Sequence, residues 1–249
     1  MNKAERQELI LNKLKVDHHV YISDLCQELD TSYDSIRRDI TELDAAGKLK
    51  RVHGGAIAKG GLPLEYVNRS DLESNAKQQL AHKAIELFHD GDILLIDGGT
   101  SNVELVRQLP SDMHFTIFTN SLPVATEFCD IKNLEIHLLG GTVFAQSRIT
   151  IGATVAEALQ AIHADWYSLG ICAIDPYDGI TDFDYEDCII KRAMVKASRQ
   201  RIVMADSSKL NTSEAYVSAQ LSEIDFLIVE DKEAERIRKT WPKNNYHIL

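Results

Sequence analysis

The sequence predicts an α/β protein in two parts: a small N-terminal module of the winged helix-turn-helix type, then a larger domain built on a Rossmann-like parallel sheet. Three observations predict this. Apolar residues of the first 60 positions recur at helical spacing, as in Ile36, Ile40 and Leu43. From about residue 77 onward, short apolar runs alternate with helical stretches, as in sheets covered by helices. Between the two parts, Lys59-Gly60-Gly61-Leu62-Pro63 interrupts any regular element.

Composition excludes several classes of protein. The chain has 249 residues, of which 44% are hydrophobic and 26% are charged, as in a globular protein with a core. Its longest aliphatic run, Ile93-Leu94-Leu95-Ile96, is far shorter than the roughly 18 residues of a membrane span. The first eight residues include acids and no apolar stretch, so we expect no secretory signal. The four scattered cysteines predict reduced core residues of a cytoplasmic protein.

Charge is distributed unevenly along the chain. The formal net charge is −11, yet the first 60 residues contain ten Lys or Arg and ten Asp or Glu, so the larger part carries the whole excess. Within the neutral part, residues 47–59 contain four basic side chains and no acid. Such a local basic segment is able to contact nucleic-acid phosphates in one orientation. It is equally compatible with an ordinary solvated surface.

The first part of the chain predicts three helices. The first ends near Asp17-His18-His19, the second begins after Ser23, a good N-cap, and the third begins after Ser32. Gly47 is a natural C-terminal stop for the third helix. A short helix, a tight turn and a longer helix form the helix-turn-helix pattern.

The third helix and the segment after it contain the candidate contacts to nucleic acid. The helix face opposite Ile36 and Ile40 is polar, and the first turns of such a helix enter the major groove of DNA. Lys48–Val52 alternates polar and apolar residues, and the glycines after it predict a hairpin, a wing that is able to contact the backbone or minor groove. The candidate contacts are Ser32, Tyr33, Asp34, Ser35, Arg37, Arg38, Thr41, Lys48, Lys50, Arg51, His53, Gly54 and Gly55. Helix-turn-helix shapes also occur in proteins that bind no DNA, although the basic wing favours DNA binding.

Two motifs in this module share the spacing of a known family. Ser32–Ile40 contains an Ile-Arg-Arg-Asp core, and His53-Gly54-Gly55-Ala56 follows it at the wing. At this spacing the motifs resemble the signature of the DeoR family of bacterial transcriptional repressors, across most of residues 3–58. The resemblance implies a winged helix-turn-helix domain over residues 1–58 that binds double-stranded operator DNA, followed by a linker over residues 59–76.

In the larger part, short apolar runs predict the strands of the sheet. They are Ile93–Ile96, Phe115–Phe118, Ile136–Leu139, Tyr167–Ile171, Ile202–Met204, Phe226–Val229 and, as a possible last strand, Tyr246–Leu249. Small and polar residues follow several of these runs. Because the carboxyl ends of parallel strands lie along one edge, and glycines and hydroxyls before a helix offer N–H groups to an anion, these loops predict a site for a phosphorylated or carboxylated small molecule.

The candidate ligand contacts come mainly from these loops. They are Asp97, Gly98, Gly99, Thr100, Ser101, Thr119, Asn120, Ser121, Gly140, Gly141, Asp175, Glu186, Lys191, Asp206 and Lys209. Strand-end packing is the alternative for the loops, and structural hydrogen bonding is the alternative for the carboxylates. Lys209 is equally well explained by a surface ion pair with Asp206, and a lysine on a helix, such as Lys191, is usually solvated. No histidine spacing indicates a metal site, and no nucleophile elbow or P-loop is present, so we expect no catalytic or metal-binding residues and no cofactor.

The order of Asp97-Gly98-Gly99-Thr100-Ser101, Gly140-Gly141, Ile174-Asp175 and Asp206-Ser207-Ser208-Lys209 also resembles the DeoR-family sensor domain. That domain is similar in fold to ribose-phosphate isomerases and glucosamine-phosphate deaminases. The resemblance implies a sensor over residues 77–249 whose ligand is a phosphorylated sugar or polyol. Ala173 and Leu210 depart from the family pattern and leave the identity of the ligand open.

Two functions fit these observations. The first is a cytoplasmic repressor of a sugar or polyol operon, a dimer or tetramer that lies on the nucleoid through its operator, contacts no membrane, and is released by a sugar or polyol phosphate. The second is an isomerase- or deaminase-type enzyme, in which Asp175 and Glu186 would move protons on a sugar phosphate. The family resemblance along nearly the whole chain favours the repressor.

Overall fold

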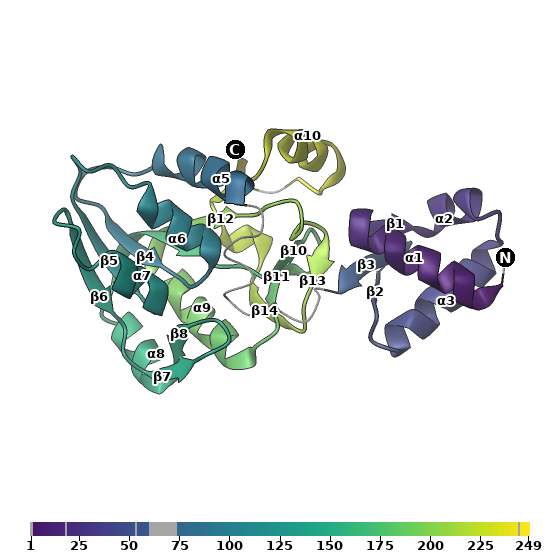
Figure 1. Ribbon diagram of the computed structural model, residues 1–249, viewed down its shortest axis with the longest axis horizontal. Coiled ribbons are helices and arrows are strands. Elements are labelled where there is room, and N and C mark those ends of the chain that lie inside the picture. The colour runs from purple at the N-terminus through teal and green to yellow at the C-terminus, as the bar shows by residue number, and fades with distance from the viewer. Residues whose placement is uncertain (1, 18, 53, 60–73, 244) are drawn as a thin grey trace.

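The computed structural model describes residues 2–17, 19–52, 54–59, 74–243 and 245–249. Figure 1 shows two bodies along the long axis of the molecule: a small one formed by the first 59 residues and a larger one formed by the residues from 74 onward. The expected linker, residues 59–76, falls largely outside the described residues.

The small body contains the three predicted helices and the predicted wing. The helices are α1 (Lys3–Asp17), α2 (Ile22–Glu28) and α3 (Tyr33–Ala45), and the strands are β1 (His19–Tyr21), β2 (Lys50–Val52) and β3 (Gly55–Lys59). Antiparallel pairing joins β3 to both β1 and β2. The predicted stripe of α3, Ile36, Ile40 and Leu43, is buried against Ile10 of α1 and Leu25 of α2. Burial of these side chains stabilises the module.

The ends of the second and third helices differ in how well the sequence predicts them. Ser32 stands at the N-cap position of α3, as predicted, but its hydroxyl bonds the Ser35 hydroxyl at 3.0 Å rather than a backbone N–H. Helix α3 ends in a Schellman turn: Gly47 has φ +70°, and the N–H of Lys48 donates to the carbonyl of Leu43 at 2.9 Å. The predicted N-cap Ser23 is wrong. Helix α2 already begins at Ile22, because the wing carbonyl of Gly54 accepts the Ile22 N–H at 2.8 Å and replaces a side-chain cap.

The larger body contains the predicted parallel sheet. Its strand order is β16-β15-β12-β9-β4-β5-β6, and each neighbouring pair is parallel. The strands are β4 (Ile93–Ile96), β5 (Phe115–Thr119), β6 (Leu134–Leu138), β9 (Ala164–Leu169), β12 (Ser198–Met204), β15 (Phe226–Ile228) and β16 (His247–Ile248). Each predicted apolar run therefore lies on or overlaps a strand of this sheet.

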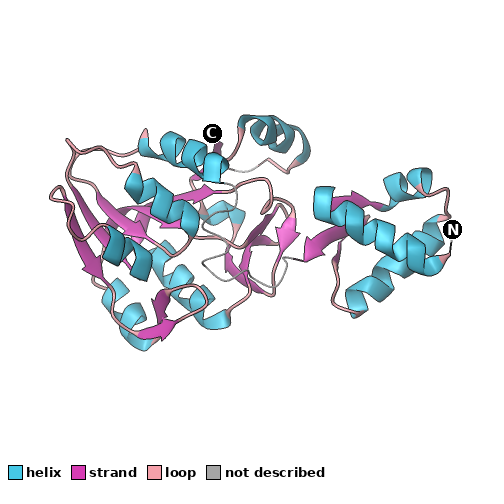
Figure 2. Cartoon of the chain, in the orientation of Figure 1, coloured by secondary structure: helices cyan, strands magenta, loops and turns pink. Residues whose placement is uncertain are grey.

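Helices cover both faces of the sheet, as Figure 2 shows. They are α5 (Ser74–Ile85), α6 (Thr100–Arg107), α7 (Leu122–Glu127), α8 (Ala153–Leu159), α9 (Tyr185–Lys196) and α10 (Asp231–Thr240), with a short 3-10 helix η1 (Leu221–Glu223). Leu94 packs with residues of α5, α6 and α7, whereas its neighbour Leu95 packs with residues of α8, α9 and α10. Alternate residues of one strand thus enter two different apolar clusters, so the central strands are buried on both sides.

Several short strands lie outside the main sheet and were not predicted. They are β7 (Thr142–Phe144), β8 (Ile149–Ile151), β10 (Ala173–Asp175), β11 (Gly179–Asp182), β13 (Thr212–Ser213) and β14 (Tyr216–Ala219). Strands β10, β11 and β14 form an antiparallel sheet, and β7 pairs with β8. Strand β13 pairs with β3 of the small body. None of the helices in the described part of the chain has the length and apolar character to cross a membrane.

Candidate functional site

The exposed face of α3 presents the predicted nucleic-acid contacts to solvent. Tyr33 is 54% exposed, and Arg37, Arg38 and Thr41 are also exposed. Asp39, between the arginines and the core, is instead buried and paired with Arg6 of α1. Arg37 and Arg38 therefore face solvent, whereas the ion pair of Asp39 with Arg6 joins α3 to α1.

Hydrogen bonds join the exposed face of α3 to the wing. The Nε of Arg38 donates to the carbonyl of Asp34 at 3.2 Å, and the Thr41 hydroxyl donates to the carbonyl of Arg37 at 2.8 Å. Arg51 of β2 reaches the same hydroxyl, with Nη1 donating to Thr41 Oγ1 at 3.3 Å. The helix and the wing therefore form one continuous polar surface.

The turn of the wing depends on its glycines. Gly54 has φ +78°, where most side chains are strained. A Cβ on Gly55 would lie 2.1 Å from the carbonyl oxygen of Val20, so only glycine lets β3 approach β1 this closely. Lys48 is exposed, while the Lys50 side chain and the whole of His53 lie outside what the structure describes.

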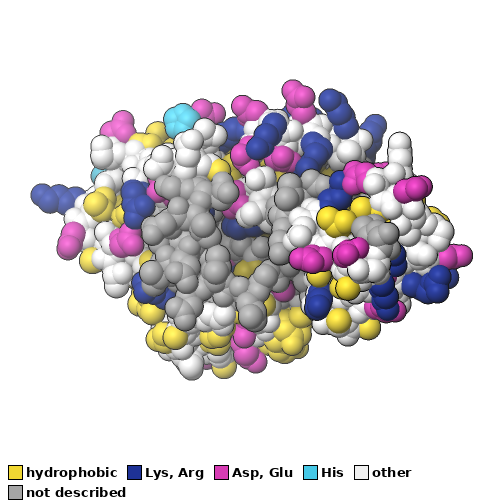
Figure 3. Space-filling model, turned by 45° about the vertical axis from the view of Figure 1, so that its right-hand side comes forward, with side chains coloured by type: hydrophobic (Ala, Val, Ile, Leu, Met, Phe, Trp, Pro, Cys, Tyr) yellow, Lys and Arg dark blue, Asp and Glu magenta, His cyan; other side chains and the backbone are white. Residues whose placement is uncertain are grey.

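One face of the molecule shows both signs of charge. On the face shown in Figure 3, Lys and Arg side chains are interspersed with Asp and Glu. Basic side chains on this face therefore form local groups among acidic ones rather than one broad basic surface.

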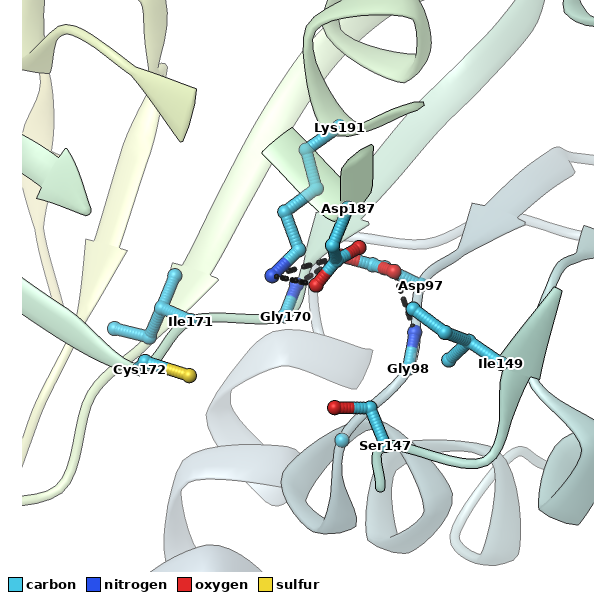
Figure 4. Close-up of a pocket in the computed structure, with 10 residues that line it drawn as sticks. Asp97, Gly98, Ser147, Ile149, Gly170, Ile171, Cys172, Asp187 and Lys191 are labelled. Carbon is cyan, nitrogen blue, oxygen red and sulfur yellow. Dashed lines mark hydrogen bonds and ion pairs between the residues drawn. The ribbon is translucent and has the colours of Figure 1, made fainter. Parts of the chain in front are cut away.

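A pocket lies at the carboxyl ends of β4 and β9, where the parallel-sheet rule places a ligand site. Its walls come from the β4–α6 loop, the β7–β8 hairpin, the loop after β9 and helix α9 (Figure 4). The lining residues are Asp97, Gly98, Gly99, Ser147, Ile149, Gly170, Ile171, Cys172, Asp187 and Lys191. The volume open to the centre of a water molecule is about 20 Å³, which is roughly the room that one water needs.

Lys191 is the centre of charge in this pocket. It is buried, its ammonium pairs with the Asp182 carboxylate, and it lies 3.0 Å from Asp187 Oδ2 and 3.9 Å from Asp97 Oδ2. Burial alone would lower the pKa of Lys191, but the three carboxylates together raise it well above its ordinary value. Lys191 therefore stays protonated, and the view that it is a solvated helix lysine is wrong.

Asp187 has spare hydrogen-bonding capacity in the pocket. Its Oδ1 is buried and has no hydrogen-bond partner among the described residues, although Oδ2 faces Lys191. Burial raises the pKa of Asp187 to about 7, with the nearby carboxylates of Asp97 and Asp182 adding to the shift against the opposing effect of Lys191. Near neutral pH this side chain is therefore able both to accept and to donate a hydrogen bond.

Helix α9 places these two side chains together. Asp184 is the N-cap, and its Oδ1 accepts the N–H of Asp187 at 2.9 Å. Because Asp187 and Lys191 are four residues apart, they share one face of the helix, which points into the pocket. Glu186, the predicted residue, is one position out of phase and is exposed.

Close packing explains the glycines of the β4–α6 loop. A Cβ on Gly98 would lie 2.4 Å from Ile149 Cγ2, and Gly99, the N-cap of α6, has φ +117°. In the facing loop, a Cβ on Gly170 would lie 2.1 Å from the carbonyl oxygen of Gly98. The loop leaves the first amides of α6 near the pocket, and the Ser101 hydroxyl beside them is buried without a partner among the described residues.

Asp97 has mainly protein partners. Its Oδ1 accepts the N–H of Gly98 at 2.6 Å, and its Oδ2 accepts the N–H of Gly170 at 3.1 Å and the Tyr167 hydroxyl at 3.2 Å. Burial raises the pKa of Asp97, with Lys191 opposing that shift. These bonds fix the β4 loop against β9, so Asp97 shapes the pocket wall.

The other predicted ligand residues lie outside the pocket lining. Thr119 at the end of β5 is buried, and its hydroxyl donates to the carbonyl of Ile96. Asn120 and Ser121 are buried in the turn that follows, where Ser121 caps α7. Asn120 Nδ2 donates to the carbonyl of Thr150 at 3.2 Å, and its Oδ1 has no partner among the described residues.

The later candidates also bond mainly within the protein. Gly141 packs against the carbonyl of Ile151, and Asp175 Oδ1 accepts two N–H groups in the β10–β11 turn. The buried Asp206 lies 3.6 Å from Lys209, and this lysine and the Ser208 hydrogen bonds lower the pKa of Asp206 despite the larger opposing effect of burial. Of the predicted set, the pocket lining contains Asp97, Gly98, Gly99 and Lys191.

Comparisons with known proteins identify the domain family of each body. The model of the DeoR-like helix-turn-helix domain matches residues 6–59, and the model of the DeoR C terminal sensor domain matches residues 72–231. The chain is 34% identical to the HTH-type transcriptional repressor GlcR of Bacillus subtilis over 236 residues, which cover 92% of this chain and 89% of that protein. It is 28% identical to the glycerol-3-phosphate regulon repressor of Haemophilus influenzae, with 93% of this chain and 91% of that protein covered.

Solved structures are also similar. One is a probable sor operon regulator from Shigella flexneri, with a TM-score of 0.37, 13% identity, and 70% of this chain and 94% of that chain covered. Another is ribose 5 phosphate isomerase A from Neisseria gonorrhoeae, with a TM-score of 0.39 and 14% identity; the match covers 57% of this chain and 54% of that chain.

Proposed function

Because this chain belongs to the DeoR family of transcriptional regulators, we propose that it is a DNA-binding repressor of a sugar or polyol catabolic operon. A phosphorylated sugar or polyol releases it from its operator. The observation that carries the proposal is one chain with two surfaces: an exposed arginine-bearing helix joined to a wing, and a buried polar pocket at the carboxyl edge of a parallel sheet.

The recognition surface is the exposed face of α3 with the wing. Tyr33, Arg37 and Arg38 are exposed on a helix whose opposite face is packed into the core, so the helix is presented rigidly. Arginine is the side chain best suited to bidentate contact with guanine or phosphate. Other exposed members of the set predicted above, such as Thr41, Lys48 and Arg51, contact base edges or phosphates around it, whereas the predicted Gly55 is buried and holds the wing against β1.

The test of this assignment is Arg38→Ala, measured by fluorescence anisotropy on an operator duplex obtained by genomic footprinting. We expect the variant to lose specific binding, because one bidentate base contact contributes about 1–3 kcal/mol to the free energy of operator binding. Its circular dichroism spectrum should stay unchanged. Arg199→Ala is the matched control, because Arg199 is an arginine of the larger body whose side chain is 75% exposed. Wild-type operator affinity in Arg38→Ala would refute the assignment of the recognition helix.

The effector is held by two kinds of contact. Beside the pocket, at the start of α6, backbone amides and the hydroxyls of Thr100 and Ser101 suit a phosphate, because the N-terminus of a helix is positive. The side chain of Asp187 suits a ligand hydroxyl, because an anionic group placed beside the carboxylates of Asp97, Asp182 and Asp187 would be repelled. The phosphate therefore lies toward α6 and the hydroxyls toward α9, with Asp206 and Lys209 as the outer contacts predicted above.

A thermal-shift screen tests the ligand class. A compound present at 100 times its dissociation constant adds about 2.7 kcal/mol to stability. We expect phosphorylated sugars or polyols to raise the melting temperature of the larger body and their unphosphorylated parents to have no effect. Asp187→Asn keeps the shape of the side chain and should weaken the response, and stabilisation by the parent sugars alone would refute the assigned class.

The protein acts as a regulator and turns over no sugar phosphate. Its characterised relatives carry the names of transcriptional repressors, which supports this view. A coupled assay over isomerisable and aminated sugar phosphates would overturn it by detecting turnover.

We further propose three properties that follow from operator binding. The protein forms a dimer or tetramer, because paired recognition helices match half-sites about 10 base pairs apart. Its DNA-binding domain spans residues 1–58, its linker residues 59–76 and its sensor domain residues 77–249. It works in the cytoplasm, on the nucleoid, where its operator lies. Sedimentation velocity and limited proteolysis check the first two.

A further inference from the structure

The DNA-binding module and the sensor share a strand pairing. Strand β3, the second strand of the wing, pairs in parallel with β13, so that Ala58 is opposite Thr212 and Lys59 is opposite Ser213 (Figures 1 and 2). The two strands are separated by more than 150 residues of sequence. A backbone ladder fixes direction and register, so this pairing sets the orientation of the module on the sensor.

Strand β13 is tied to the Asp206–Lys209 turn on its N-terminal side. The segment from Asp206 leads directly into it, and the Thr212 hydroxyl donates to the carbonyl of Lys209 at 2.7 Å. The same carbonyl accepts the N–H of Ile174 on β10 at 3.0 Å. A displacement of the Asp206–Lys209 turn therefore moves β13.

A second connection leaves β13 on its C-terminal side. The N–H of Glu214 donates to Thr181 Oγ1 on β11 at 2.7 Å, and Thr181 is buried. The next residue, Asp182, pairs with Lys191 in the pocket. The wing, β13, β11 and the pocket lysine thus form one continuous series of contacts.

The small volume of the pocket indicates that this arrangement is the effector-free state. The space of about 20 Å³ admits roughly one water, whereas pockets for small organic ligands are typically about 300–1,000 Å³. A sugar phosphate fits only after the loops and α9 move apart. Because Lys191 on α9 is bonded to Asp182, such a movement is transmitted to β11 and to β13.

We propose that the β3–β13 pairing is the contact through which effector occupancy controls the DNA-binding module, and that the paired arrangement is the operator-binding one. This inference rests on the proposed function. Effector binding widens the pocket, shifts β13 and releases β3, so the two recognition surfaces of an oligomer lose their common orientation. Effector binding and the β3–β13 pairing are linked equilibria. A change that stabilises the pairing must therefore weaken effector binding by the same factor by which effector binding weakens the pairing.

A reversible disulfide across the pairing tests the inference. Ala58→Cys and Thr212→Cys place cysteines on directly opposed residues. Neighbouring strands lie about 4.8 Å apart, which is within the Cα range of disulfides. The exposed Cys129 is replaced by Ser in all variants to avoid mispairing. Operator binding of the full chain is followed by fluorescence anisotropy while glycerol 3-phosphate, glucose 6-phosphate, fructose 1-phosphate and glucosamine 6-phosphate are titrated in turn.

The oxidised protein should keep operator affinity within about twofold of the reduced one, but need at least tenfold more effector for release. Dithiothreitol should restore the effector response of the double variant to that of its never-oxidised form. Each single-cysteine variant should respond to effector equally with and without dithiothreitol. Release of the oxidised protein at the normal effector concentration overturns the coupling. Loss of operator binding on oxidation alone overturns the assignment of the paired state.

A second variant tests the same path without a disulfide. Thr181→Val keeps the shape of the side chain but removes the acceptor for the Glu214 N–H. It should bind the operator normally and shift the effector midpoint severalfold, and Thr181→Ser should restore the wild-type midpoint. An unchanged midpoint in Thr181→Val argues against this route. If the wild type binds no operator or no compound releases it, the proposed function fails as well; a responsive wild type with unaltered variants refutes the pairing inference alone.

Discussion

Replacement of Lys191 by methionine should destabilise the sensor strongly. Lys191 is buried, and its ammonium is 3.0 Å from Asp187, 3.9 Å from Asp97 and paired with Asp182. Methionine fills a similar volume but leaves three buried carboxylates without a cation. Removing one partner from a buried ion pair typically costs about 3–5 kcal/mol, a large share of the total stability of about 5–15 kcal/mol.

Thermal unfolding measures this loss. For a domain of this size about 1 kcal/mol corresponds to about 2–4 °C, so the melting temperature of the sensor should fall by about 6–20 °C. The carboxylates escape their repulsion by binding protons, so the loss should be smaller at pH 5 than at pH 8. Lys196→Met on the same helix is the control, because Lys196 is exposed, and it should change stability by less than about 0.5 kcal/mol. If Lys191→Met melts within 1–2 °C of the wild type at pH 8, the central role of Lys191 in the pocket is contradicted.

Three further results are expected. Gly170→Ala would place its Cβ 2.1 Å from a backbone carbonyl oxygen, so it should lower the urea midpoint markedly, whereas Gly140→Ala, where the described residues leave open space, should not; equal midpoints would contradict the packing argument. The pKa of Asp187 is raised from its ordinary 3.8 to about 7, so the folded state retains a proton that the unfolded state loses, and stability should fall from about pH 4 to pH 7 by at most about 1.4 kcal/mol per pH unit. Asp187→Asn should flatten that slope in urea titrations, and an unchanged slope would assign the pH dependence to other groups. Finally, burial raises the pKa of the Cys188 thiol to about 12 while Cys129 is exposed, so iodoacetamide at pH 7.5 should label Cys129 and spare Cys188 in the mass spectrum of the native protein. Rapid labelling of Cys188 would contradict its burial.

Local patterns predicted the elements well. The stripe of Ile36, Ile40 and Leu43, the end of α3 at Gly47 and the apolar strands of the main sheet each depend on a few neighbouring residues, and the structure confirms them. Ser23 was misjudged because a carbonyl from the wing, more than 30 residues later, satisfies the amide that a cap would have bonded. The preference for a side-chain cap is local, but the partner that replaced it is not.

The pocket was only partly predictable for the same reason. The loop Asp97-Gly98-Gly99 follows a strand and was found, whereas Ser147, Gly170 and Cys172 reach the pocket from loops whose placement depends on the whole fold. The role of Asp187 could be predicted from the sequence, because an N-cap at Asp184 and the four-residue spacing to Lys191 put Asp187 and Lys191 on one face of the helix. Glu186 lies on a different face and is exposed. The pairing of β3 with the two-residue strand β13 has no local signal at all.

The most direct test of the account is operator binding with and without effector. An operator duplex identified by footprinting is titrated with the full chain, and the complex is then challenged with phosphorylated sugars and polyols and with their unphosphorylated parents. The account predicts tight, salt-sensitive binding that one phosphorylated compound reverses and its parent does not. Absence of any protected site on genomic DNA, or release that ignores the phosphate group, would contradict it.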